Sequence, residues 1–242
     1  MIKTNLKELE RFLIDLGLGS GDNILIHADL RIFGRLEGNG ADLISLLREL
    51  VGRQGLLCTP SFTFSFPQDF DIKNTKSNIG ALTTLFSNFD SVCRVPDGMT
   101  SYYLVGDNSL EMIKNWDNTS YGPGSIIGQL LKINGKVLQL GTDILSPVHY
   151  VEELVGVPYR TVKRFEGCII DENSNYHSYT DFYARTMDVK KIIPDPIRSD
   201  FYFSNSNKIS YNKREIRLFS LEEFVNYASP RLTDDKLILI ED

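Results

Sequence analysis

Residues 136–153, KVLQLGTDILSPVHYVEE, decide the fold of this chain. The stretch begins with apolar, β-prone residues, turns at Gly141 and a polar segment, and then reaches Pro147 and His149. Proline suits the first turn of a helix, so a helix is expected to begin just before His149. The pattern therefore indicates a strand, a loop and a helix start that carries a histidine.

His149 has two acidic neighbours at helical spacing. Glu152 follows it by three residues and Glu153 by four, so the imidazole can share a helix face with a carboxylate. A carboxylate raises the basicity of an imidazole and fixes its tautomer, as a general base requires. The spacing fits equally well a structural histidine that bonds to a backbone carbonyl, so both interpretations stay open here.

Length and composition indicate one folded domain over residues 1–242. Hydrophobic residues make up 42% and charged residues 24% of the chain, which is typical of folded globular proteins. The net charge of −6 disfavours nucleic acid as the main partner and is compatible with a cationic small substrate. No apolar segment resembles a signal peptide or a membrane span, so we expect a cytoplasmic protein without a membrane partner.

The cysteines do not suggest covalent or metal cross-links. Cys58, Cys93 and Cys168 are an odd number at wide spacing, without a CxxC pair. Such spacing predicts neither a disulfide framework nor a structural zinc site, and we expect no metal.

Helices and strands alternate along the chain. We expect helices at residues 6–16, 41–51, 80–89, 109–116, 126–131 and 221–227. Strands are expected at residues 23–27, 56–64, 91–95, 102–105, 137–140, 160–170 and 176–182, around Phe201 and Arg217, and at 237–240. This order predicts a layered α/β architecture, with the site among the loops at one end of the sheet. Residues 60–82 lack a clear period and predict a long loop over that site.

A glycine-rich helix start precedes the central stretch. In YGPGSIIGQLLKI, residues 121–133, Gly124 precedes Ser125, which suits the N-cap of a helix. Backbone N–H groups at such a start bind anions, so a phosphate could dock there. Most glycine-rich helix starts are only turns, and this one matches neither the P-loop nor the dinucleotide motif.

Several short motifs in order resemble the aminoglycoside N3-acetyltransferase family, over about residues 25–181. They are IHADL, TPSFT, NIGAL, DGMTS, YGPGS, GKVLQLG and HYVE. The resemblance implies a single α/β domain with a central mixed β-sheet flanked by helices on both faces. It also implies acetyl-coenzyme A as the donor, an amino sugar as the acceptor, and direct transfer without a covalent intermediate.

The resemblance also suggests roles for individual residues. His149 and Glu152 match the family's T-x-x-H-x-x-E segment, and Ser101 matches the last serine of its R-S-x-H-P-x-H-S motif. The positions that match a coenzyme A cradle are Asp29, Leu30 and Gly34.

The chain departs from the family at one motif. Asp97, Gly98 and Thr100 stand where the family has His, Pro and His, and Ser146 and Pro147 also differ. The substrate is then either an aminoglycoside or, as the altered motif favours, another amino sugar, such as a nucleotide-linked sugar for a surface polysaccharide, and the chain is a divergent member.

Acyl transfer to an amine needs a base and donors for the oxyanion. We assign the base to His149, oriented by Glu152, Asp181 or Asp71, a choice that the sequence leaves open. The candidates for coenzyme A, including its phosphates, are the segment Asp29 to Gly34 with Arg31, then Arg35, Ser101, Gly124 and Ser125. The candidates for the substrate ammonium are Asp69, Asp71 and Asp97, although acidic loop residues usually face water.

Three other functions compete with this hypothesis. A cysteine-based acyltransferase or hydrolase would use Cys93 or Cys58 as its nucleophile. A metal hydrolase would use His149, Glu152 and Glu153, although the three histidines show no ligand spacing. A non-catalytic sugar- or coenzyme A-binding homologue is the third. The expected partners are an amino sugar and coenzyme A, and a homodimer is left open.

Overall fold

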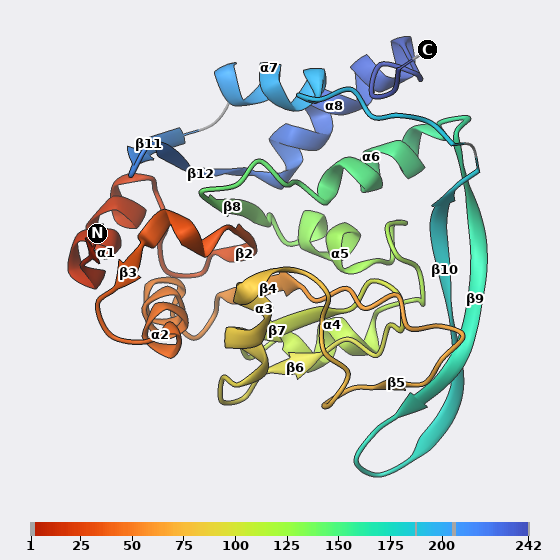
Figure 1. The fold of residues 1–242 in the computed structure, drawn as a ribbon, viewed down its shortest axis with the longest axis horizontal. Coiled ribbons are helices and arrows are strands. Elements are labelled where there is room, and N and C mark those ends of the chain that lie inside the picture. The colour runs from red at the N-terminus through yellow and green to blue at the C-terminus, as the bar shows by residue number, and fades with distance from the viewer. Residues whose placement is uncertain (1–2, 187, 205–206, 242) are drawn as a thin grey trace.

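The computed structural model describes residues 3–186, 188–204 and 207–241 (Figure 1). Its helices are α1 Leu6–Asp15, α2 Gly40–Val51, α3 Gly80–Ser87, α4 Ser109–Lys114, α5 Ile126–Lys132, α6 Pro147–Val155, α7 Pro196–Ser204 and α8 Leu221–Asp234, with a 3-10 turn, η1, at Leu30–Phe33. Its strands are β1 Lys3–Thr4, β2 Asn23–Ala28, β3 Arg35–Leu36, β4 Leu56–Pro60, β5 Phe70–Asp71, β6 Cys93–Arg94, β7 Tyr102–Val105, β8 Lys136–Leu140, β9 Arg160–Ile170, β10 Asn175–Arg185, β11 Asn207–Tyr211 and β12 Arg214–Ser220. No helix in these described ranges is both long and apolar enough to cross a membrane.

A seven-stranded mixed sheet forms the centre of the molecule, in the order β11-β12-β8-β2-β4-β7-β6. Strand β2 runs parallel to both of its neighbours, β4 and β8, whereas β12 and β7 are antiparallel to the strands they join. The carboxyl ends of β2, β4 and β8 therefore lie together at one edge of the sheet. Ligands of open α/β sheets bind outside such an edge.

Alternate residues of each central strand face two separate cores. On β2, Ile24 and Ile26 pack with the helices α1, α2 and α3, whereas Leu25 packs with α5, α6 and α8 on the opposite face. All three side chains are fully buried, and each such burial contributes about 2 kcal/mol to folding. The predicted mixed sheet with helices on both faces is confirmed.

A long hairpin stands beside the sheet (Figure 1). Strands β9 and β10 pair over their full length, from Arg160 opposite Arg185 to Ile170 opposite Asn175. The hairpin is joined to the loop before α5 by a bridge between Asp181 and Thr119. It forms one wall of the region around α6.

The last part of the chain differs from the prediction. Phe201 was expected in a strand but lies in α7, and β12 pairs instead with β11 and β8. Helix α7 begins at Pro196, and Asp195 Oδ1 accepts the Arg198 N–H at 3.0 Å, a capping signal that the sequence carried. The strand expected at residues 237–240 is also wrong, since only Ile240 forms a bridge, with Lys191.

Candidate active site

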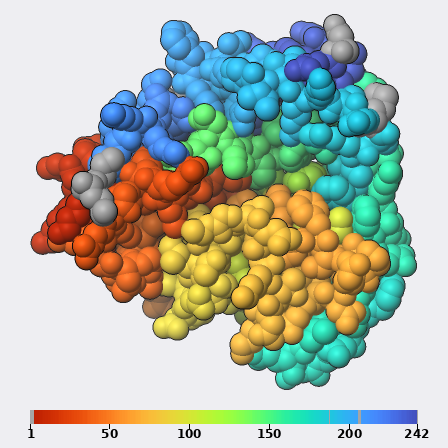
Figure 2. Space-filling view, viewed as in Figure 1, coloured from red at the N-terminus to blue at the C-terminus, as the bar shows by residue number. Residues whose placement is uncertain are grey.

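Two cavities meet at the carboxyl edge of the sheet. The first, here called the apolar cavity, has a volume of about 230 Å³ and lies against the ends of β2 and β4 and against α3. The second, the His149 cavity, has a volume of about 310 Å³ and includes His149 and Glu152. Phe62, Ile144 and Ser146 line both. The space-filling view shows the molecule hollowed where the orange loop at residues 60–82 meets the green and blue segments (Figure 2).

Helix α6 carries the His149 imidazole into the second cavity. Pro147 is the first residue of the helix, as predicted, and Gly156 ends it in the left-handed conformation. His149 Nδ1 lies 2.5 Å from Glu152 Oε2. A neutral imidazole therefore donates its Nδ1–H to the carboxylate, which leaves the lone pair of Nε2 for a substrate proton.

Two residues that the sequence did not reveal hold Glu152 in place. Tyr159 Oη donates to Glu152 Oε1 at 2.9 Å, and Arg160 Nε lies 2.9 Å from Oε2. The side chains of Glu152 and Arg160 are only 3% and 6% exposed, so this ion pair is shielded from solvent. Both carboxylate oxygens are occupied, and the carboxylate cannot rotate away from His149.

The expected protonation states of Glu152 and His149 are compatible with a general base. Burial opposes ionisation of Glu152, but His149, Arg160 and Tyr159 together lower its pKa to about 2. Burial also lowers the pKa of His149, and Arg160 adds to this effect while Glu152 opposes it. At neutral pH the pair is therefore a carboxylate beside a neutral imidazole, which can accept a proton.

Asp181, which with Asp71 was an alternative partner of the imidazole, lies in a different ion pair. Arg164 binds both of its oxygens at 2.8 Å, which lowers the pKa of Asp181. The imidazole instead contacts Glu152 and Arg160, and its ring packs against Tyr121 with centroids 5.0 Å apart. The structure thus brings His149 and Glu152 together and leaves Asp181 outside this contact.

His27 is a second histidine at the edge of the sheet. It is the penultimate residue of β2, lines the apolar cavity, and its Nε2 lies 3.2 Å from Ser146 Oγ. Burial lowers the pKa of His27 to about 4, so the ring is neutral at pH 7. The sequence indicated it only as part of the segment that resembles a coenzyme A cradle.

Of the predicted cradle residues, Asp29 and Arg31 line a polar cleft of about 580 Å³, whereas Leu30, Gly34 and Arg35 do not. Asp29 caps η1 and pairs with Arg31 and Arg214, which lower the pKa of its carboxyl group. Leu30 begins η1 and Gly34 ends it, with φ 58° and ψ −116°, a conformation that favours glycine. The cleft touches the apolar cavity at Thr142.

The motif that departs from the family is buried and internally bonded. Asp97 is 1% exposed and accepts hydrogen bonds from the Met99 N–H and from the hydroxyls of Thr100 and Thr180. Ser101, also buried, donates to the Val95 carbonyl at 2.7 Å. Asp97 therefore connects this loop to β10, and its surroundings provide no surface for a substrate.

The glycine-rich helix start is also packed inside the protein. Ser125 caps α5 as predicted by accepting the Gly128 N–H at 3.1 Å, and its side chain is fully buried. A Cβ atom at Gly124 would lie 1.9 Å from Asp117 Oδ2, the end of an exposed side chain that would have to move. Ser125 thus has a structural role, and neither residue lines the cavities described above.

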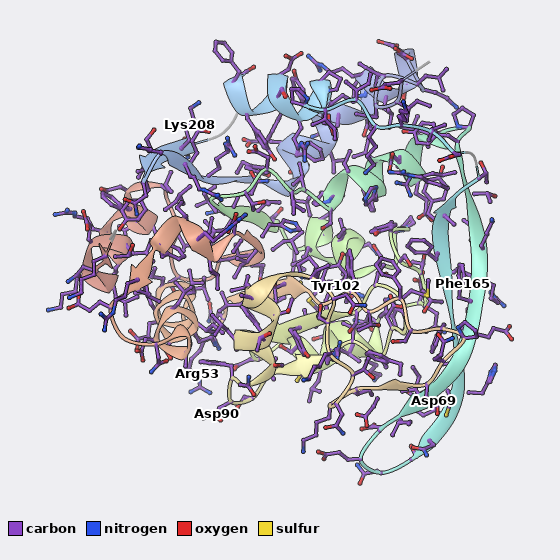
Figure 3. All side chains as sticks on the ribbon, in the orientation of Figure 1. Arg53, Asp69, Asp90, Tyr102, Phe165 and Lys208 are labelled. Carbon is purple, nitrogen blue, oxygen red and sulfur yellow. The ribbon has the colours of Figure 1, made fainter. Side chains whose placement is uncertain are left out.

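The acidic residues of the long loop lie elsewhere. Asp71 accepts hydrogen bonds from Lys73 N–H and from Asn74, and lines a separate pocket with Arg94. Asp69 is exposed near the lower part of the β9–β10 hairpin, away from α6 (Figure 3). The loop itself approaches the site through Phe62.

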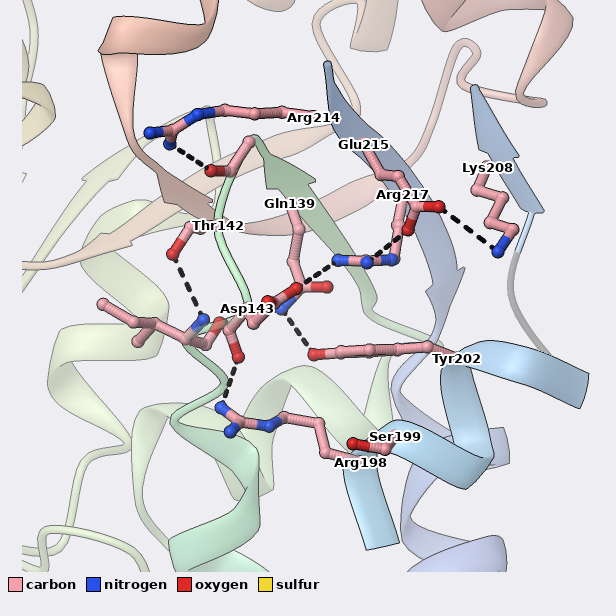
Figure 4. A network of polar contacts seen from close by, with 12 residues as sticks. Gln139, Thr142, Asp143, Arg198, Ser199, Tyr202, Lys208, Arg214, Glu215 and Arg217 are labelled. Carbon is pink, nitrogen blue, oxygen red and sulfur yellow. Dashed lines mark hydrogen bonds and ion pairs between the residues drawn. The ribbon is translucent and has the colours of Figure 1, made fainter. Parts of the chain in front are cut away.

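Side chains from the end of the chain hold the loop between β8 and α6 (Figure 4). Gln139 Nε2 donates to the Ile144 carbonyl and lies 2.7 Å from Tyr202 Oη on α7. Arg217 on β12 binds Asp143 Oδ1 at 2.7 Å, and Arg198 on α7 donates to the Asp143 carbonyl. The loop that brings Ser146 and His149 to the cavities is thus fixed by α7 and β12.

The geometry does not favour the cysteine alternative. Cys58 is fully buried and Cys93 is half-buried, and burial raises the pKa of both thiols. A nucleophilic cysteine needs a lowered pKa. Within the described ranges no group of three histidine, cysteine or acidic residues is arranged to hold a metal ion.

The comparisons with known proteins all find the same family. A family model described as aminoglycoside 3-N-acetyltransferase matches residues 25–233. Aminoglycoside N(3)-acetyltransferase VII of Streptomyces paromomycinus is 25% identical over 215 residues, which cover 77% of this chain and 74% of the relative. Aminoglycoside N(3)-acetyltransferase IX of Micromonospora chalcea is 25% identical over 183 residues, 65% of each chain.

Solved structures share the fold. The aminoglycoside acetyltransferase AAC(3)-IIb superposes with a TM-score of 0.83 at 19% identity, over 97% of this chain and 98% of its own. AAC-IIIb, in a binary structure with CoASH, has a TM-score of 0.82 at 19% identity, over 96% and 97% of the two chains. At sequence identities this low, the structural similarity shows the fold alone.

Proposed function

Because the chain belongs to the aminoglycoside 3-N-acetyltransferase family, we propose that it moves an acetyl or other short acyl group from coenzyme A to the amine of an amino sugar, with His149 as general base. Membership confirms the predicted enzyme class, an acyl-coenzyme A dependent N-acyltransferase. The contact that carries the assignment of the base is the 2.5 Å approach of His149 Nδ1 to Glu152. We propose further that residues 1–242 act as one catalytic domain.

The arrangement of cavities supports a route for the donor. The polar cleft offers Arg31 and Arg214 for phosphate groups, and the apolar cavity beyond Thr142 suits a pantetheine arm. A thioester that follows this route reaches Ser146 and Phe62, where the His149 cavity begins. The co-substrate supplies an activated acyl group at that junction.

The His149 cavity is the proposed acceptor site. An ammonium group cannot attack a thioester, so the incoming amine must lose a proton to a base. Nε2 of His149 is the group available for that proton, and Glu152 stabilises the imidazolium that forms. Arg160 and Tyr159 keep Glu152 in position during the step.

We propose a nucleotide-linked amino sugar as the acceptor in preference to an aminoglycoside. The family motif that differs in this chain, around Asp97, Gly98 and Thr100, is one basis. The cations that line the His149 cavity are a second basis for this choice. A non-catalytic binding homologue remains the alternative, and the retained His149–Glu152 contact argues against it.

Release of free thiol from acetyl-coenzyme A, measured with and without amine acceptors, tests the function directly. We expect thiol release with a nucleotide-linked amino sugar and less with aminoglycosides such as sisomicin, which was solved in complex with a relative. Thermal unfolding with coenzyme A is the companion measurement, because a ligand at a hundredfold its dissociation constant stabilises the folded state by about 2.7 kcal/mol. Binding of coenzyme A without turnover on any amine would favour the non-catalytic alternative. Size-exclusion chromatography tests the homodimer, which stays a prediction.

A further inference from the structure

Three cations line the wall of the His149 cavity. They are Arg185 at the end of β10, Lys191 in the segment that follows, and Arg198 on α7. The carboxylates that line the same cavity are Glu152 and Asp195. The balance between these groups decides which substrate charge the cavity favours.

Both carboxylates are engaged in contacts of their own. Glu152 binds His149, Tyr159 and Arg160, so its charge is balanced by the Arg160 guanidinium. Asp195 caps α7 and lies 3.9 Å from Arg198 Nε. These pairs leave Arg185 and Lys191, neither of which forms an ion pair or side-chain hydrogen bond with a residue in the described ranges.

The unpaired cations act on the catalytic centre. Burial lowers the pKa of the Lys191 ammonium; Glu152 opposes this effect, and the cations of Arg185, Arg160 and Arg198 add to it. Lys191 in turn acts on the His149 imidazole. A polycationic acceptor would meet like charges here, whereas an anionic group would gain charge-assisted hydrogen bonds.

We propose that Arg185 and Lys191, with the paired Arg198 beside them, bind a phosphate group of the acceptor within the His149 cavity. The proposal rests on the proposed function and specifies its substrate class, an amino sugar that carries a phosphate or diphosphate, such as a nucleoside-diphosphate-linked sugar. The fork of an arginine and the point charge of a lysine are the usual partners of phosphate oxygens.

Coenzyme A also carries phosphates, but its geometry fits this wall less well. The pantetheine arm separates the thioester from the phosphates, whereas Lys191 lines the same cavity as His149. The polar cleft with Arg31 and Arg214 shares none of its lining residues with the His149 cavity and offers a separate place for the donor's phosphates. An anion at Arg185 and Lys191 therefore belongs to the acceptor.

Thermal unfolding of the whole protein with uridine diphosphate as the probe tests the subsite. The variants are Arg185→Gln and Lys191→Gln, and the matched control is Lys190→Gln, because Lys190 is an exposed neighbour that does not line the cavity. We expect uridine diphosphate to raise the midpoint of the wild type and of the control. Each cavity variant should weaken its binding about tenfold, the equivalent of one charge-assisted hydrogen bond.

Parallel titrations with coenzyme A identify the source of the phosphate. Unchanged coenzyme A affinity in both cavity variants supports the proposal. Lost coenzyme A affinity with intact uridine diphosphate binding would assign the wall to the donor and overturn it. Equal binding of uridine diphosphate to all four proteins, or none to the wild type, would also overturn it.

The outcome is separable from that of the proposed function. A wild type that binds uridine diphosphate through Lys191 but transfers no acyl group would retain the subsite and reject the transferase. The opposite outcome is acyl transfer in which the KM for a nucleotide-linked amino sugar is the same in the wild type, Arg185→Gln and Lys191→Gln. That result would retain the transferase and reject the subsite.

Discussion

Arg160 on β9 and Glu152 on α6 form an ion pair with a distance of 2.9 Å between Nε and Oε2. The pair joins the hairpin to the helix that carries His149, and both side chains are buried. Breaking a buried pair leaves an uncompensated charge, so the geometry of the imidazole depends on a residue from another element. The position of the His149 imidazole, the proposed base, therefore depends on the hairpin as well as on α6.

His149→Ala removes the proposed base. We expect kcat to fall by roughly two to four orders of magnitude, the usual contribution of a positioned base, with coenzyme A affinity nearly unchanged. Steady-state kinetics and a coenzyme A titration measure the two quantities. Wild-type turnover in this variant would exclude His149 from the mechanism.

Arg160→Gln is expected to move the pH dependence of kcat/KM. In the wild type the acid limb should lie below pH 6.5, the ordinary pKa of histidine, because burial and Arg160 lower the pKa of His149. Without the guanidinium the imidazolium is less disfavoured, so the limb should move to higher pH.

Two further variants separate charge from position in that experiment. Arg160→Lys retains the positive charge and should move the limb less, while Tyr159→Phe removes only a neutral donor to Glu152. An identical limb in the wild type and Arg160→Gln would contradict an electrostatic role for Arg160.

Glu153→Gln is expected to change how stability depends on pH. Burial, with Asp117 and Asp181 nearby, raises the pKa of Glu153 from 4.5 to about 7. The unfolded chain therefore loses this proton at lower pH than the folded protein, and the wild type should lose stability as pH rises from 4.5 to 7.

The variant cannot ionise at this position, so it should be more stable than the wild type at pH 8, by on the order of 1 kcal/mol. Near pH 4 the difference should disappear, because the carboxyl group is then neutral in both states. Urea unfolding at the two pH values gives the comparison. A stability difference that does not vary with pH would show that Glu153 ionises normally.

Cys93→Ala should leave turnover nearly unchanged. Burial raises the pKa of the Cys93 thiol, so little thiolate is present at neutral pH. Activity before and after treatment with a thiol reagent provides a second measurement, with the variant as control. A dead Cys93→Ala enzyme that still unfolds cooperatively would revive the cysteine mechanism.

The sequence predicted local relationships better than distant ones. Pro147 marked the start of α6, and the three-residue spacing placed Glu152 beside His149, because both follow from helical geometry. Tyr159 and Arg160 reach the same carboxylate from beyond the helix, and no periodic pattern encodes that approach. They emerge only when β9 is placed against α6.

Burial was the property that sequence patterns indicated least well. Asp97 looked like a substrate ligand because it replaces a histidine of the family motif, yet three donors enclose its carboxylate. No motif or regular spacing in the sequence marks Arg185, Lys191 and Arg198 as members of one site. The turn into α7 brings them to one cavity.

The contacts of Asp143 with Arg198 and Arg217, and of Gln139 with Tyr202, have a consequence for synthesis. A nascent chain that has left the ribosome only as far as α6 already contains His149 and Glu152, but not the residues that fix the loop before them. A domain generally folds as a unit during synthesis, so its last elements must emerge before it is complete. Activity should therefore appear late, once α7 and β12 have emerged, and prematurely terminated chains would contain His149 and Glu152 without an ordered site.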